Sequence, residues 1–360
     1  VPIAQERTRI SIRWQAIRYH FIPPSFLPAI LGAVVAGVST GKFSWWYFGL
    51  VLIGVISNHA ALNMTDEYYD YKYSIDALKP GEKNPYAGGS GVLTGGLIKA
   101  KDLVRAFLLG YLVTILIGLY LTVKIGWPIL AFGVFGMFCS YFYTAPPVKF
   151  AFRGWGEMGL LVNFGSTIGL GSYFVQTQSL SWEAFWATLP LGIMLFSMIV
   201  INEIPDYDED RKGGKLTLIA RYGKAAGVKL YIISLILAYM VMIGAVVARI
   251  VPLTALIVLG GAPLVYRSIK ILRKNYDHPL KMMPANLTMI RIHSLTGILL
   301  ITAYAWQGIR VGSLAGKDAL LLLLILAFLY VPLARSLLTS GPSSKVLGKN
   351  VDGRILSETG

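Results

Sequence analysis

Two clusters of acidic residues lie at the ends of long apolar stretches of this sequence. They comprise Asp66, Glu67 and Asp70 in the first cluster and Glu203, Asp206, Asp208, Glu209 and Asp210 in the second. A carboxylate at the edge of hydrocarbon is costly unless a cation or another partner compensates its charge. The two clusters therefore predict a cationic ligand that both of them contact.

Within each cluster, oxygen-bearing side chains recur at intervals of four residues. Residues four apart on a helix differ in direction by about 40°, so Asp66 and Asp70 share one face, as do Asn202, Asp206 and Asp210. Such oxygen-lined faces favour Mg²⁺, which one or two carboxylates commonly hold together with substrate phosphate oxygens. The 4 histidines are scattered along the chain, so a zinc or iron site is not expected.

Basic side chains lie close to both clusters. Lys72 follows the first cluster, and Lys212 and Lys215 follow the second. A third loop carries Tyr143, Lys149 and Arg153. Carboxylates that bind a metal, with cations nearby, are suited to a diphosphate, because both neutralise the charge that develops on the leaving group. In an apolar chain this combination predicts a lipid diphosphate substrate.

A glycine-rich run at residues 88–96 follows the first cluster. It does not contain the G-x-x-x-x-G-K-[ST] pattern of phosphate-binding loops. Contact with phosphate and an ordinary turn therefore both remain open for this segment.

The elements that position these residues are expected to be membrane helices. Hydrophobic residues make up 55% of the chain and charged residues 14%, with a mean hydropathy of +0.61. A helix needs about 20 apolar residues to cross a hydrocarbon core roughly 30 Å thick. The apolar stretches are residues 23–40, 45–65, 103–123, 127–144, 156–177, 185–204, 226–248, 251–268, 288–308 and 318–337. We expect an all-α polytopic membrane bundle of nine spans, with a further apolar helix at the C-terminal end.

The basic residues predict the orientation of this bundle. In the expected topology, 28 of the 33 lysines and arginines fall on one side. Short cytoplasmic loops collect Lys and Arg, so both termini and both acidic clusters are predicted to be cytoplasmic. Topology and anionic lipid headgroups account for the net charge of +15, and no nucleic-acid partner is expected. The lone Cys139 offers neither a disulfide nor a thiolate metal site.

The two clusters resemble the paired aspartate-rich motifs of the UbiA superfamily of intramembrane prenyltransferases. The segment from Asn63 to residue 76 is most similar to the menaquinone branch, the 1,4-dihydroxy-2-naphthoate prenyltransferases. The same holds for residues 89–93, Tyr143 with Lys149, Arg153 with Glu157, and residues 214–218. The resemblance implies nine spans around a central cavity that holds Mg²⁺ and a prenyl diphosphate. The chain departs from the family pattern at Asp66, where the family usually has Asn.

The resemblance also assigns roles to individual residues. The implied metal ligands are Asp66, Asp70, Asp76, Asp206 and Asp210. The implied diphosphate contacts are Asn63, Asn202, Lys72, Arg153, Lys212 and Lys215. Asp70, Asp206 and Asp210 would act in catalysis together with Lys149 and Tyr143. Tyr143 could offer its hydroxyl or its π face to an allylic cation, or it could be an ordinary interfacial anchor.

The predicted activity is Mg²⁺-dependent transfer of a prenyl group, for example from geranylgeranyl diphosphate, to an aromatic acceptor in the membrane. The favoured acceptor is 1,4-dihydroxy-2-naphthoate; 4-hydroxybenzoate, homogentisate and a glycerol-phosphate lipid remain open. A cation-coupled transporter is disfavoured, because transporters usually place carboxylates near the membrane midplane. The expected organisation is a cytoplasmic segment 1–22, a UbiA-like domain 23–310, an additional apolar helix 311–339 and a polar tail 340–360 that we expect to be disordered.

Overall fold

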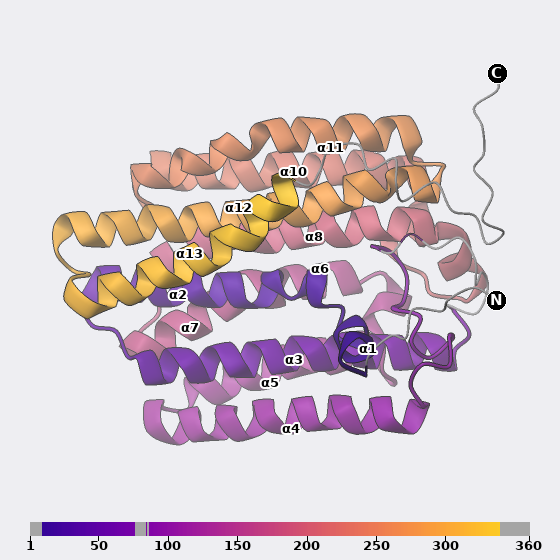
Figure 1. Cartoon of the computed structure of the whole chain (residues 1–360), viewed down its shortest axis with the longest axis horizontal. Helices are drawn as coiled ribbons and strands as arrows, with labels where there is room; N and C mark the ends of the chain where they lie inside the picture. The colour runs from indigo at the N-terminus through magenta and orange to yellow at the C-terminus, as the bar shows by residue number, and fades with distance from the viewer. Residues whose placement is uncertain (1–8, 76–83, 85, 339–360) are drawn as a thin grey trace.

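The protein is a bundle of helices that run roughly along its longest axis (Figure 1). The computed structural model describes residues 9–75, 84 and 86–338, and these residues contain no strand. The α-helices are α1 Arg9–Ala16, α2 Pro23–Thr40, α3 Trp45–Lys72, α4 Ala100–Ile125, α5 Pro128–Tyr141, α6 Gly156–Val162, α7 Ile168–Thr177, α8 Trp182–Lys212, α9 Leu218–Tyr222, α10 Lys224–Val247, α11 Ala262–Asn275, α12 Pro279–Val311 and α13 Gly316–Leu338. Shorter helical segments are the 3₁₀ turns η1 Tyr19–Phe21, η3 Phe150–Arg153 and η5 Leu253–Gly261 and the π-helical η4 Asn163–Thr167.

The all-α architecture expected from the hydropathy pattern is confirmed. Within the described part of the chain, 9 helical stretches are long and apolar enough to cross a membrane. The stretch expected at 127–144 forms only the shorter α5, of 14 residues. Gly126 and Pro128 bound this helix at its start, and Pro146 and Pro147 follow its end, so both flanks disfavour a longer helix. The expected C-terminal helix is α13, whereas the tail 340–360 lies outside the described residues.

Helices α3 and α8 extend well beyond their apolar stretches. Ser44 begins α3 by accepting a hydrogen bond from the Tyr47 amide at 3.4 Å. Ser181 begins α8 in the same way, with the Ala184 amide at 3.2 Å. These side chains satisfy amides that have no partner inside the helix. Because α3 continues to Lys72 and α8 continues to Lys212, both acidic clusters lie on helices.

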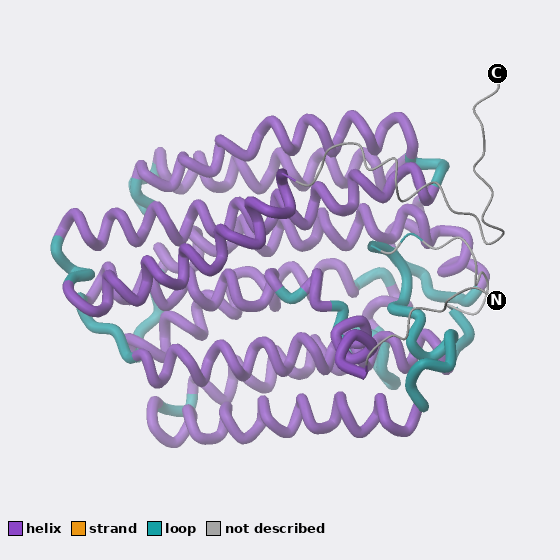
Figure 2. The backbone as a smooth tube through the Cα atoms, in the orientation of Figure 1, coloured by secondary structure: helices purple, strands orange, loops and turns teal. Residues whose placement is uncertain are grey.

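The loops that adjoin the acidic clusters meet at one end of the bundle. The segments that follow α3, α5 and α8 all lie at the right-hand end in Figure 2, together with α1. This is the end at which the acidic turns of α3 and α8 lie. The connections α2–α3, α4–α5 and α12–α13 lie at the opposite end. The fold thus brings together the acidic clusters and the basic loops that adjoin them in the sequence.

Glycines allow close approach where η4 crosses α8. A Cβ atom on Gly165 would lie 2.7 Å from the Cα atom of Gly192, and one on Gly192 would lie 2.5 Å from the carbonyl oxygen of Leu161. No side chain fits at such distances. Small residues at helix crossings are characteristic of membrane bundles, where packing rather than water exclusion holds the helices together. This crossing fixes the position of Phe164, which lines the cavity described below.

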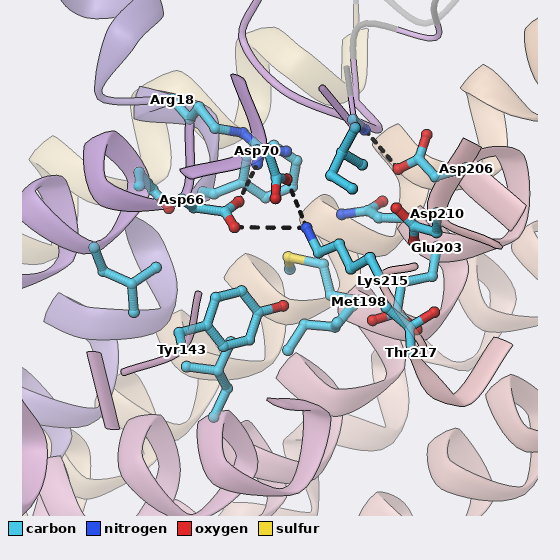
Figure 3. A pocket seen from close by; sticks show the side chains of 18 of the residues that line it. Arg18, Asp66, Asp70, Tyr143, Met198, Glu203, Asp206, Asp210, Lys215 and Thr217 are labelled. Atoms are coloured by element: carbon cyan, nitrogen blue, oxygen red, sulfur yellow. Dashed lines mark hydrogen bonds and ion pairs between the residues drawn. The ribbon is translucent and has the colours of Figure 1, made fainter. Parts of the chain in front are cut away.

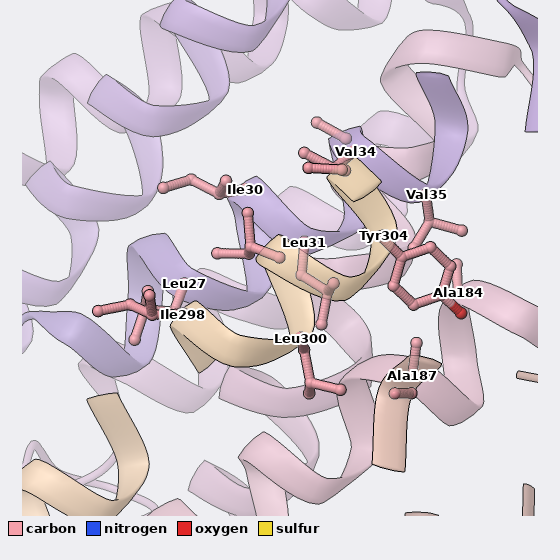
Figure 4. Close-up of a cluster of buried hydrophobic side chains, with 14 of the residues drawn as sticks. Leu27, Ile30, Leu31, Val34, Val35, Ala184, Ala187, Ile298, Leu300 and Tyr304 are labelled. Atoms are coloured by element: carbon pink, nitrogen blue, oxygen red, sulfur yellow. The ribbon is translucent and has the colours of Figure 1, made fainter. Parts of the chain in front are cut away.

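Buried apolar side chains of α2, α8, α12 and α13 form a continuous core. Leu27, Leu31 and Val35 of α2 pack with Leu300 and Tyr304 of α12, and Ala184 and Ala187 of α8 complete the cluster (Figure 4). Leu322, Leu326 and Leu333 of α13 also join it. The cavity described below is lined instead by residues near the loop-facing ends of α3 and α8.

Candidate active site

A cavity opens among the loop-facing ends of α3 and α8, with an empty volume of about 900 Å³. One part of its wall is polar and is lined by Asp66, Asp70, Asp206, Asp210 and Lys215. Another part is apolar and is lined by Phe21, Leu62, Leu160, Phe164, Leu195, Met198 and Ile199. Tyr143 also lines the cavity, and Figure 3 shows the polar groups converging within it. A charged group and an apolar chain could therefore lie in the same site.

The acidic turn of α3 supplies the first row of oxygens. Asp66 and Asp70 are 9% and 4% exposed and line the cavity. Asn63 also lines it, and its amide donates to the carbonyl of Ile17 at 2.9 Å. Glu67 contacts the glycine-rich loop instead, accepting hydrogen bonds from the amides of Ser90 and Val92. The helical spacing thus separates residues that face the cavity from one that holds a loop.

The acidic end of α8 supplies the second row. Asn202, Asp206 and Asp210 all line the cavity. The amide of Asn286 on α12 donates to Asn202 Oδ1 at 2.9 Å, which fixes the Asn202 side chain. Asp206 Oδ2 accepts a hydrogen bond from the backbone of Gly88 at 2.7 Å. The glycine-rich loop therefore contacts both acidic helices, through Glu67 on α3 and Asp206 on α8.

Lys215 is the cation at the centre of the carboxylates. Its Nζ atom lies 2.6 Å from Asp70 Oδ2 and 3.6 Å from Asp66 Oδ1. Burial alone would lower the pKa of Lys215, but the charges of Asp66, Asp70 and Asp210 outweigh burial and raise it well above its usual value. The ammonium group therefore remains protonated at neutral pH.

Tyr143 lies at the boundary between the polar and apolar parts of the cavity. It is 9% exposed, and burial raises the pKa of its hydroxyl well above the usual range, with the Asp66 charge acting in the same direction. The phenol is therefore neutral and can donate a hydrogen bond. Its ring lies so close to Gly156 that a Cβ atom there would be 2.8 Å from Tyr143 Cε2, so the backbone of α6 fixes the ring.

The other predicted cations lie outside the lining of this cavity. Lys149 Nζ lies 3.6 Å from the centroid of the Tyr73 ring, and Lys72 Nζ lies 5.8 Å from that of Tyr69. Arg153 is exposed and donates to the carbonyl of Pro147 at 3.1 Å. Lys212 is exposed, and Asp76 lies outside the described residues. Of the basic residues proposed from the motifs, only Lys215 lines the cavity.

Three residues of this site were assigned no role from the sequence, although Glu203 belongs to the second acidic cluster and Glu157 to the segment near Arg153 that resembles the family. Arg18 lines the cavity from the segment before α2, and its Nη1 atom lies 3.7 Å from Asp66 Oδ2. Glu203 also lines the cavity. Glu157 is fully buried and accepts a hydrogen bond from the Leu218 amide at 2.7 Å, which holds the start of α9. Glu203 could have been found from its place in the second cluster, whereas Arg18 had no local signal beyond its charge.

The donors of this site fit a hard divalent cation. Asp66 Oδ1 is buried and has no hydrogen-bond partner among the described residues, and the Lys215 ammonium beside it shows that the carboxylates already attract a cation. No set of three His, Cys, Asp or Glu side chains in the described chain lies close enough to hold an ion alone. Mg²⁺ needs only one or two carboxylates when waters and substrate phosphates complete its shell. Asp70, Asp206 and Asp210 could supply these ligands, with Asp66 next to them.

Comparison with known proteins gives consistent results. The sequence model of the UbiA prenyltransferase family matches residues 25–295. A 1,4-dihydroxy-2-naphthoate octaprenyltransferase of Bacillus subtilis (strain 168) is 28% identical over 296 residues, which are 82% of this chain and 93% of that protein. A 2-carboxy-1,4-naphthoquinone phytyltransferase of Synechocystis is 23% identical over 291 residues, 80% of this chain and 92% of that protein.

A solved structure shares the fold. It is a UbiA homologue from Archaeoglobus fulgidus bound to GPP and Mg²⁺, with a TM-score of 0.54 and 14% sequence identity. The similarity covers 81% of this chain and 99% of that one. At this identity the likeness concerns the arrangement of helices.

Proposed function

Because this chain belongs to the UbiA prenyltransferase family and is an integral, multi-pass membrane enzyme, we propose that it transfers a prenyl group from a polyprenyl diphosphate to 1,4-dihydroxy-2-naphthoate. The observation that carries the proposal is the convergence of the two carboxylate rows and Lys215 on one cavity that is also partly apolar. The choice of acceptor is supported by the names of the two relatives above, both of which act on naphthalene-derived substrates.

The diphosphate end of the reaction is assigned to the polar wall. Bound Mg²⁺ would supply Lewis-acid stabilisation of the departing diphosphate, with Asp70, Asp206 and Asp210 as its ligands and Asp66 beside them. Lys215 would donate to a diphosphate oxygen as the allylic carbon–oxygen bond breaks and its electron pair leaves on the diphosphate. Asn202 is held by Asn286 and would donate its amide to the same group.

The apolar wall is assigned to the prenyl chain and the reacting carbon. Leu160, Phe164 and Met198 would exclude water from the allylic cation, which water would otherwise capture. The ring of Tyr143 would stabilise this cation through its π face, and its neutral hydroxyl could donate to an oxygen of either substrate. The electron-rich ring of the acceptor then attacks the cation and forms the new carbon–carbon bond, and the ring becomes aromatic again as its carboxylate leaves as CO₂.

The remaining cations are proposed to act at the mouth of the cavity. Lys72 and Lys212 are the last residues of α3 and α8, and Lys149 and Arg153 lie in the connection between α5 and α6. Their long-range field would attract an anionic diphosphate, an effect that weakens as salt concentration rises. Asn63 and Asp76 remain proposed contacts from the motif resemblance. The excess of basic residues in these loops supports a cytoplasmic location for both termini and for the site.

The test is to incubate the purified chain with Mg²⁺, geranylgeranyl diphosphate and 1,4-dihydroxy-2-naphthoate, and to follow diphosphate release and the prenylated product. We expect Mg²⁺-dependent product, with EDTA and the variants Asp70→Ala and Asp206→Ala each removing it. Product from 4-hydroxybenzoate or homogentisate but not from the naphthoate would reject the acceptor. The absence of product with every acceptor would reject the activity.

A further inference from the structure

Two basic side chains line the cavity in the part of the chain that the structure describes, and they lie on opposite sides of Asp66. Lys215 approaches Asp66 Oδ1 at 3.6 Å, whereas Arg18 approaches Asp66 Oδ2 at 3.7 Å. Lys215 also contacts Asp70 and belongs to the carboxylate rows. Arg18 instead lies beside Phe21, with its Cζ atom 4.8 Å from the ring centroid. The cavity therefore has a second cationic position outside the proposed diphosphate site.

The backbone holds Arg18 in a conformation that its residue type disfavours. Its φ and ψ angles are 50° and 52°, in the left-handed region, which costs a non-glycine residue about 1 kcal/mol or more. The turn is maintained by a hydrogen bond from the Phe21 amide to the Arg18 carbonyl at 2.8 Å. Asn63 anchors the same turn to α3 through the carbonyl of Ile17. Glycine or asparagine would adopt this turn more easily.

The guanidinium group of Arg18 has hydrogen-bonding capacity to spare. It carries five N–H donors, yet it makes no hydrogen bond to any residue that the structure describes, because the distance to Asp66 exceeds the normal range. Its side chain is 18% exposed. A planar guanidinium with free donors binds a carboxylate through two parallel hydrogen bonds.

Aromatic and apolar groups surround the position where such a carboxylate would lie. Phe21, His59 and Leu62 line the cavity together with Arg18. The ring of His59 contacts that of Phe164 at a centroid distance of 4.6 Å, so these two rings form a continuous wall. A flat aromatic ring could pack against this wall by edge or face contacts.

We propose that Arg18 binds the carboxylate of the aromatic acceptor and so selects an aromatic acid over its neutral analogues. This inference deepens the proposed function and rests on it. The acceptor's ring would pack along Phe21, His59 and Phe164, while its carboxylate would lie on the side of Asp66 that faces away from Lys215. The donor's diphosphate and the acceptor's carboxylate, both anionic, would then bind to separate cations with the carboxylate rows between them.

The test measures equilibrium binding of 1-hydroxy-2-naphthoate and of its neutral carboxamide to the full chain in detergent with Mg²⁺ and without a prenyl donor. For the wild type we expect the acid to bind about 10- to 100-fold more tightly than the amide, as for charge-assisted hydrogen bonds. Arg18→Gln should remove this preference by weakening binding of the acid alone, and Arg18→Lys should keep part of it. Arg13→Gln is the matched control, because Arg13 is exposed on α1, and it should behave as the wild type.

Equal binding of acid and amide to the wild type would overturn the inference even if Arg18→Gln fails to fold. Equal weakening of both ligands by Arg18→Gln would assign it a structural role. Loss of geranylgeranyl diphosphate binding with unchanged acid binding would assign Arg18 to the diphosphate. These outcomes are independent of turnover, so a failure of the proposed activity, seen as no product from any acceptor, is distinguishable from a failure of this assignment.

Discussion

Lys215→Met should destabilise the protein in the absence of metal and make it respond more strongly to Mg²⁺. The ammonium group lies 2.6 Å from Asp70 and 3.6 Å from Asp66, and the side chain is 10% exposed. Methionine has a similar length and no charge, so the substitution removes the cation nearest to Asp70 while nearly preserving volume, and Arg18 remains beside Asp66.

The expected magnitude follows from this geometry. Removing one partner of a buried ion pair costs about 3–5 kcal/mol, and we take the lower value because the cavity is open. With an unfolding entropy of about 2.1 cal/mol/K per residue, a loss of about 3 kcal/mol over this chain lowers the melting temperature by roughly 4 °C. Bound Mg²⁺ would replace the missing positive charge. Because stabilisation by a ligand increases with its concentration relative to Kd, the melting temperature of the variant should rise as Mg²⁺ is added.

The assay is thermal unfolding in detergent, first in EDTA and then across a Mg²⁺ titration. We expect Lys215→Met to melt below the wild type in EDTA and to gain more from Mg²⁺, because Lys215 no longer competes for the carboxylates. Lys229→Met on the exposed face of α10 is the control and should change neither quantity. If Lys215→Met matches the wild type in EDTA and gains no more from Mg²⁺, the carboxylates are not a site that a cation must neutralise.

Three further predictions concern the loop, the helix crossing and the orientation. Glu67→Gln should weaken the hydrogen bonds that anchor the glycine-rich loop to α3, at a cost of about 1–3 kcal/mol. Because the loop is then held less firmly, trypsin should cleave after Lys99 faster than it does in the control variant Asp102→Asn. Gly192→Val should lower the free energy of unfolding by about 1–3 kcal/mol through overpacking. Gly118→Ala should not, because there is open space at the Cβ position of Gly118. Equal stability of the two variants would refute the close crossing of η4 and α8. In a Cys139→Ser background, an impermeant maleimide applied to intact cells should label a cysteine at position 42 and spare one at position 99, and the reverse pattern would overturn the cytoplasmic assignment.

Hydropathy predicted the architecture well because membrane helices satisfy their backbone groups internally and must be apolar over a known length. The apolar stretches end at residues 65 and 204, and the four-residue spacing of the carboxylates predicted that helix continues beyond them. The helices continue to Lys72 and Lys212, since charged residues outside the hydrocarbon are compatible with helix. Because both helices continue, Asp66 and Asp70 share one helical face, as do Asp206 and Asp210.

Which basic side chains line the cavity was harder to predict. Lys149 and Lys215 follow equally plausible motifs, yet only Lys215 lines the cavity, whereas Lys149 packs against Tyr73. Arg18 enters the cavity because a left-handed turn redirects the chain before α2. Such placements depend on tertiary contacts, in this case between Asn63 and Ile17, which residue spacing along the chain does not encode.

The most direct test of the central claim is a single-turnover assay of the purified chain with geranylgeranyl diphosphate and 1,4-dihydroxy-2-naphthoate. We expect prenylated naphthalene product and stoichiometric diphosphate only when Mg²⁺ is present. Asp70→Asn and Asp206→Asn should each slow the step by about 100-fold or more, a typical loss for one electrostatic contact. Product formation that does not depend on Mg²⁺, or that proceeds at the wild-type rate in both variants, would show that the two carboxylate rows are not the catalytic metal site.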